Sequence, residues 1–216
     1  MTRVALLLLA LPALCAAQAD APVPIPEVKP GDWWVYQRMD YDDDKPRGRY
    51  EMRVVFSGRG VIQVVNTQGD HDKEVDVTFT SEWNGVSMQG RVFYPHTGLL
   101  KFPLQVGASY KSVYEVVQTK SRASSKDEKE VKVVGWENIT VPAGKFRALK
   151  IVAEGTFRRL DSPNSGSSRN VIWYVPEVKR WVKMISEIRP IGQGRGRGGG
   201  SRGEHVGEEL VDFNVQ

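Results

Sequence analysis

The sequence predicts an all-β protein built as a single antiparallel meander of about ten or eleven strands, strongly curved and with little helix. Apolar and polar residues alternate at 50–56 and 75–79, which is typical of a strand with one buried face. After the N-terminal apolar run, no long segment shows the apolar spacing of an amphipathic helix. Turn sequences such as Val-Pro-Ala-Gly at 141–144 separate the alternating segments and favour hairpins.

One segment, VIWYV at 171–175, is apolar on both faces, so we expect a central strand that is covered on both sides. A sheet this wide must curl, split or close, because strands twist and free edges aggregate. A half-barrel, a barrel and a sandwich all meet that requirement, and the pattern does not choose among them. The other expected strands lie at 33–39, 61–66, 86–94, 110–118, 130–136, 147–155, 181–188 and 206–215.

The N-terminal residues have the composition of a secretory signal peptide. Arg3 supplies a positive charge, residues 4–15 form an apolar run, and Ala17-Gln18-Ala19 offers small residues for cleavage. The run is too short for a membrane-spanning helix, so we expect a protein that is not transmembrane. We expect it to be periplasmic or secreted after cleavage near Ala19.

The composition then predicts the domain organisation. We expect a signal peptide at 1–19, a proline-rich linker at 20–30 and a single β domain at 31–216. The domain would contain a flexible Gly/Arg-rich loop at 190–205. Because the one cysteine, Cys15, lies in the expected leader, the mature chain would form no disulfide and carry no thiolate ligand.

Several motifs carry a family resemblance. They are GWENITVPAGKF at 135–146, RALKI at 147–151, WYVPEV at 173–178, WVK at 181–183 and EELVDF at 208–213, with GDWW at 31–34 and FPLQVG at 102–107 upstream. Together they resemble a family of exported bacterial β-proteins classed as a domain of unknown function, over about residues 30–216. The resemblance implies a periplasmic protein with a curved antiparallel sheet. More distantly, it implies the β-clam architecture of lipoprotein carriers, and it brings no catalytic residues.

Four carboxylates, on Asp40, Asp42, Asp44 and Glu51, have the spacing of an EF-hand calcium loop. Lys45 stands where such a loop needs a glycine for its sharp turn, and no helices are expected on either side. We therefore expect no bound metal, and we interpret the segment as a solvated loop between two strands.

The segment GQGRGRGGGSRG at 192–203 is similar to the RGG tracts that bind nucleic acid. It lies between two expected strands of an exported domain, and the chain has a formal net charge of only +4. We therefore expect a hairpin loop and no nucleic-acid partner. An anionic surface, such as lipopolysaccharide or phospholipid headgroups, is the alternative contact for this loop.

Residues that could carry catalysis are scattered along the chain. The three histidines have no metal-ligand spacing, and no G-x-S-x-G motif is present. The carboxylate pairs at 128/130 and 208/209 follow patterns typical of solvated strand faces or loops. We therefore expect no cofactor and no enzymatic activity, and a hydrolase is the least favoured hypothesis.

The aromatic residues of the C-terminal half are the strongest functional signal. Trp136, Trp173, Tyr174 and Trp181 are interpreted mostly as core residues. On a concave sheet face they could instead line a site for an apolar small molecule or lipid, which is our leading functional hypothesis. The alternative is a cell-envelope interaction or assembly module that docks a protein through a strand edge or a loop.

Overall fold

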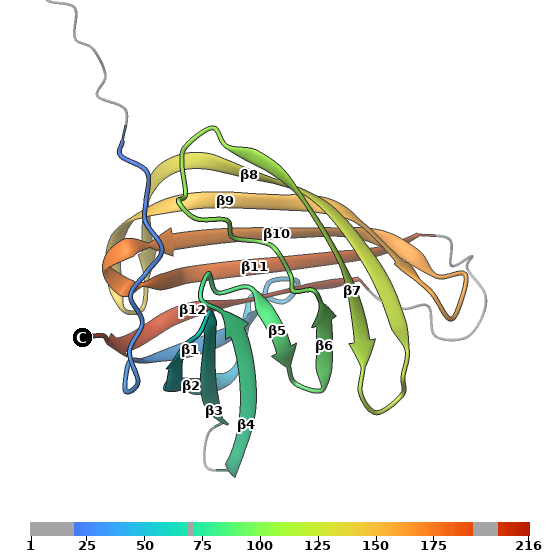
Figure 1. The fold of residues 1–216 in the computed structure, drawn as a ribbon, viewed down its shortest axis with the longest axis horizontal. Coiled ribbons are helices and arrows are strands. Elements are labelled where there is room, and N and C mark those ends of the chain that lie inside the picture. Colours follow the sequence, from blue (N-terminus) through green and yellow to red (C-terminus); the bar gives the residue numbers. More distant parts are fainter. Residues whose placement is uncertain (1–19, 69–70, 192–202) are drawn as a thin grey trace, which may run out of the picture.

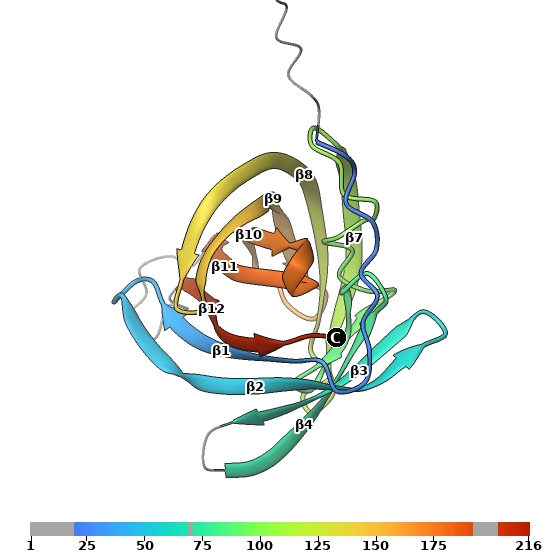
Figure 2. The same ribbon diagram turned by 90° about the vertical axis from the view of Figure 1, so that its left-hand side faces the viewer.

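The computed structural model describes residues 20–68, 71–191 and 203–216, in which twelve strands form one closed antiparallel barrel (Figures 1 and 2). The expected signal peptide at 1–19 and most of the Gly/Arg-rich loop lie outside these described residues. The strands are β1 (Trp33–Asp40), β2 (Lys45–Gly58), β3 (Val61–Gln68), β4 (His71–Thr80), β5 (Gly85–Met88), β6 (Arg91–Tyr94), β7 (Ser109–Gln118), β8 (Ser124–Val141), β9 (Gly144–Arg159), β10 (Ser165–Val175), β11 (Arg180–Ile191) and β12 (Glu204–Asn214). A single turn of 3-10 helix, η1 (Pro176–Val178), joins β10 to β11 within the described chain.

The strand order confirms the predicted meander and selects the closed barrel. Each strand pairs with its neighbours in sequence, and β1 pairs with β12 to close the sheet. The prediction of one strand at 86–94 was wrong, because this segment forms the two short strands β5 and β6. They meet at Gln89 and Gly90, whose φ values of 50° and 76° suit the two-residue turns that join tight hairpins.

The meander gives the barrel two different ends. The hairpin turns β1–β2, β3–β4, β5–β6, β7–β8 and β9–β10 lie at one end, which we call the hairpin end. The C-terminus, η1 and the N-terminal segment at 20–32 lie at the other end, which we call the closed end (Figure 1). No helix of the described residues has the length and apolar character needed to cross a membrane.

The segment at 20–30, expected to be a linker, is extended and packs on the barrel. Val23 and Leu104 exchange two backbone hydrogen bonds of 2.8 Å, and Val23 and Val28 are buried. Lys179 Nζ donates to the carbonyl oxygen of Glu27 at 2.7 Å. This segment therefore adds apolar cover to the folded domain.

The long β8–β9 hairpin covers part of the outer surface. It arches over β10 and β11 (Figure 2), and the backbone N–H of Ala143 donates to Leu210 of β12 at 2.9 Å. Phe146 of β9 packs near Phe213 of β12, with their ring centroids 6.3 Å apart. The two faces of residues 171–175 are consequently both buried, which confirms the prediction of a covered strand.

Alternation sets which side chains enter the barrel. Tyr50, Met52 and Val54 are buried, as their period of two predicts. Phe56 continues the same pattern in the sequence but is 43% exposed, because a bulge after Val54 shifts the register. At the closed end the inward side chains fill the interior, whereas further along the barrel they leave a cavity.

Candidate functional site

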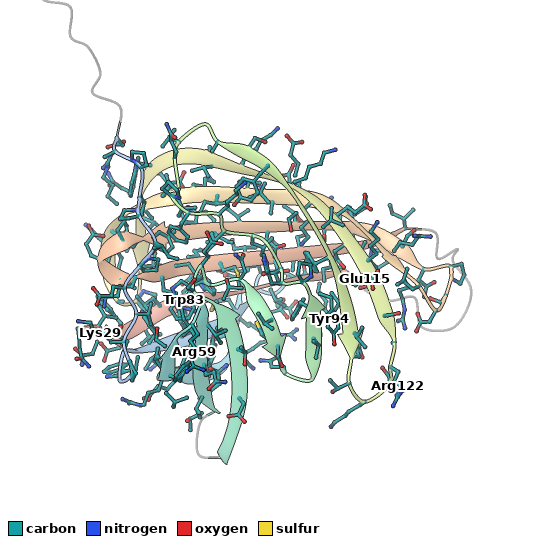
Figure 3. The ribbon with its side chains drawn as sticks, viewed as in Figure 1. Lys29, Arg59, Trp83, Tyr94, Glu115 and Arg122 are labelled. Atoms are coloured by element: carbon teal, nitrogen blue, oxygen red, sulfur yellow. The ribbon has the colours of Figure 1, made fainter. Side chains whose placement is uncertain are left out.

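The interior of the barrel contains a cavity of about 810 Å³, within the range of small-molecule sites. At the hairpin end its lining includes the exposed residues Gln89 and Arg91, so the cavity opens to solvent there. At the other limit its lining includes Trp83 and Arg180, which are 2% and 1% exposed. Figure 3 shows Trp83 toward the closed end of the barrel, so this limit of the cavity lies on that side.

The apolar lining of the cavity is rich in methionine. Apart from Met1, every methionine of the chain lines the cavity. A methionine side chain is unbranched and polarisable, so it adapts to apolar ligands of different shape. These residues are Met39, Met52, Met88 and Met184, and they are joined by Phe79, Phe93, Leu99 and Ile172.

The wall formed by β7, β8 and β10 is polar. Lys129 Nζ donates a short hydrogen bond to Asn170 Oδ1, and the Tyr114 hydroxyl donates to Asp127 Oδ1 at 3.4 Å. Burial raises the pKa of Asp127, although the neighbouring Lys129 charge opposes that shift. Burial also lowers the pKa of Lys129. The Ser168 hydroxyl, buried in the same wall, has no hydrogen-bond partner. This wall can therefore still form a hydrogen bond to a polar group in the cavity.

The closed end of the cavity holds a buried cation. Arg180, the first residue of β11, has its guanidinium carbon 3.7 Å from the ring centroid of Trp181 and 4.2 Å from that of Trp83. Three further rings, of Trp34, Tyr36 and Phe79, surround it. Its Nε and Nη1 atoms have no hydrogen-bond partner. An arginine stays protonated when buried, so this is a charged group with unsatisfied donors.

A carboxylate near this cation is already held by neutral donors. Glu208 of β12 accepts hydrogen bonds from Trp181 Nε1 at 2.6 Å and from the Tyr50 hydroxyl at 2.5 Å. Burial, and then the charge of Glu208, raise the pKa of Tyr50, while Arg180 lowers it. Among the residues described, Arg180 forms an ion pair with no carboxylate. The positive charge of Arg180 and the negative charge of Glu208 therefore act on the same part of the cavity without contacting each other.

The structure places the four predicted aromatic residues in different environments. Trp181 lines the cavity, whereas Tyr174 is fully buried in the core. Trp173 points to the covered outer face of β10, where its indole N–H donates to Glu137. Trp136 is partly buried under the guanidinium of Arg147, 4.6 Å from its ring centroid. Of the four, only Trp181 is brought to the cavity.

Sequence reasoning missed Arg180 and the polar wall. Arg180 follows Lys179 in a turn, a context that favours an exposed side chain. The polar wall had a usable signal, because the residues at 124–130 are polar at both alternating positions of a strand. Such a strand has one polar face inside the barrel as well as one outside, which is typical of a barrel with an open interior.

The calcium-spaced carboxylates are not gathered into a site. Asp40 accepts hydrogen bonds from the side chain of Arg47 and the backbone N–H of Asp42. Glu51 forms an ion pair with Arg53 at 2.6 Å. Within the described residues, no group of three side chains from His, Cys, Asp and Glu is placed to hold a metal ion.

The fold defines a class, the closed up-and-down antiparallel barrel with an internal cavity. Two solved structures are similar to this chain. One is described as a "putative lipoprotein" from Parabacteroides distasonis, with 12% identity and a TM-score of 0.54. The other is described as a "putative exported protein with YmcC-like fold" from Bacteroides fragilis, with 13% identity and a TM-score of 0.52. Each match covers 90% of this chain and 100% of the other.

These likenesses show a shared fold. No protein-family model matches the chain, and no curated protein matches it.

Proposed function

We propose that this protein is a non-catalytic binding protein that holds an apolar or lipid-like ligand inside its barrel. The observation that carries the proposal is the cavity of about 810 Å³, with methionine and aromatic side chains in its lining. Protein interiors are normally close-packed, so an open volume of this size at the centre of a small barrel favours a ligand.

An extracytoplasmic location is part of the same proposal. It is supported by the signal-peptide composition of residues 1–19. The two proteins of similar fold carry the descriptions "lipoprotein" and "exported protein", each qualified as putative, which agree with that location. The more distant resemblance to the β-clam architecture of lipoprotein carriers, expected from the sequence, agrees with a ligand that is partly apolar.

The alternative function, docking of an envelope protein, has less support. Each of the twelve described strands has a partner strand on both sides, and only short stretches lack one, such as the part of β4 before Thr78 on its β5 side. Docking through a loop stays a hypothesis without an observation that favours it.

The test is titration with N-phenyl-1-naphthylamine, a neutral apolar dye that fluoresces when it leaves water. We expect saturable binding to the wild-type protein. Ser168→Phe places a ring in the cavity from a side chain that makes no hydrogen bond, so it is expected to weaken binding at least about tenfold.

The matched control is Arg169→Phe, one residue along β10, where the side chain is exposed outside the barrel. It is expected to leave dye affinity unchanged. Absence of dye binding to the wild type, or equal affinity of the wild type and Ser168→Phe, would refute the proposal. Melting curves of both variants would show that each is folded.

A further inference from the structure

We propose that the ligand carries a carboxylate, and that this carboxylate binds Arg180 at the closed end of the cavity. This inference rests on the proposed function, because it names the polar end of the apolar ligand. The ligand would then be an amphiphile with one anionic head, inserted head first.

The first step concerns the guanidinium itself. Arg180 is 1% exposed and lines the cavity, and its Nε and Nη1 atoms lack any hydrogen-bond partner. Aromatic rings interact with a guanidinium through their faces, which offsets charge but accepts few hydrogen bonds. The N–H groups lie in the guanidinium plane and require an oxygen acceptor, and the described residues supply none to Nε and Nη1.

The second step concerns the charge that the acceptor carries. A buried cation without an ion-pair partner is costly, so an anion is favoured at this position over a neutral acceptor. Glu208 does not serve, because its oxygens accept from Trp181 and Tyr50 and do not contact Arg180 Nε or Nη1. Its negative charge nearby also disfavours a doubly charged group such as a phosphate monoester. A singly charged carboxylate fits one guanidinium best.

The third step concerns orientation. Arg180 and its rings lie at the closed end, and the methionines Met39, Met88 and Met184 line the cavity toward the hairpin end. The opening lies at Gln89 and Arg91. A carboxylate at Arg180 therefore places an acyl chain between these methionines, with its tail toward the opening.

The experiment compares two ligands of the same chain, cis-parinaric acid and its methyl ester, by fluorescence titration at neutral pH. The ester keeps the apolar chain and lacks the negative charge. We expect the wild-type protein to bind the acid at least about tenfold more tightly than the ester, because only the acid pairs with Arg180.

Arg180→Met removes the charge and keeps an unbranched side chain, so it is expected to abolish the preference while retaining ester binding. The matched control, Arg169→Met, removes an exposed arginine on β10 and is expected to keep the preference. Glu208→Gln removes the nearby negative charge and is expected to strengthen acid binding about threefold. A variant that damaged the cavity as a whole would instead weaken the binding of both the acid and the ester.

The outcomes separate the two proposals. If neither the acid nor the ester binds the wild-type protein, the proposed function fails and this inference fails with it. If both bind equally, or if folded Arg180→Met keeps the preference for the acid, only the carboxylate site is overturned. If Arg180→Met does not fold, the carboxylate site is tested by the affinities of the wild-type protein for the acid and for the ester.

Discussion

Replacing Trp83 by alanine is expected to cost a large part of the stability of the barrel. Trp83 is 2% exposed and packs edge-on against Trp34 and Phe79, with ring centroids 5.4 Å and 5.3 Å away. Its indole Nε1 donates to the carbonyl oxygen of Lys179 at 2.7 Å, which ties the loop between β4 and β5 to the turn before β11. One side chain therefore joins three parts of the closed end.

The magnitude follows from these contacts. Truncating a buried tryptophan to alanine costs about 3–5 kcal/mol in lost burial and cavity formation. The lost hydrogen bond adds about 1 kcal/mol. The expected decrease in the free energy of unfolding is therefore about 4–6 kcal/mol, which corresponds to a fall in Tm of roughly 10–20 °C for a domain of this size.

The assay is urea unfolding followed by far-UV circular dichroism, because the substitution itself changes tryptophan fluorescence. Trp33→Ala is the control, since Trp33 is only partly buried and is covered by Arg53. We expect the control to lose less than about 2 kcal/mol. A loss below about 2 kcal/mol for Trp83→Ala would show that Trp83 does not organise the closed end.

Three further predictions concern stability. Gly155→Ala would place a Cβ atom 1.9 Å from the carbonyl oxygen of Glu128, so a loss of about 3 kcal/mol is expected in urea unfolding, and an unchanged midpoint would refute it. Val23→Asp would put a charge where the N-terminal segment packs, and it should lower stability by about 2 kcal/mol and speed proteolysis before residue 30; equal cleavage rates would argue against docking of the segment. Stability should fall as the pH rises above about 10, because the unfolded state then loses tyrosine protons that the folded state keeps; absorbance at 295 nm and circular dichroism should change together. Burial raises the pKa of the tyrosines concerned, which are Tyr36, Tyr41, Tyr50, Tyr110, Tyr114 and Tyr174.

Local pattern was enough to predict much of the fold. The alternation at 50–54 and the doubly apolar run at 171–175 correspond to an inward-facing row and a covered strand. Closure of the barrel could not be predicted in this way. It depends on pairing between Trp33 and Asn214, at opposite ends of the domain, and no period-two pattern records which strands are partners. The bulge that exposes Phe56 likewise leaves no mark on the pattern.

The candidate site was less accessible to sequence reasoning. Trp181 was identified because aromatic residues are frequent in pockets, and it does line the cavity. Arg180 was not, because its burial depends on Trp34, Phe79 and Trp83, which lie far away in the sequence. A basic residue beside a turn is usually exposed, so its environment could be recognised only once the strands were placed in space.

Native mass spectrometry of the protein, purified gently from the cell envelope of its own host, tests ligand binding most directly. We predict a mass excess over the polypeptide that disappears on denaturation and that corresponds to an amphiphile with one carboxylate. A mass equal to that of the polypeptide alone would contradict a ligand-binding role for the cavity.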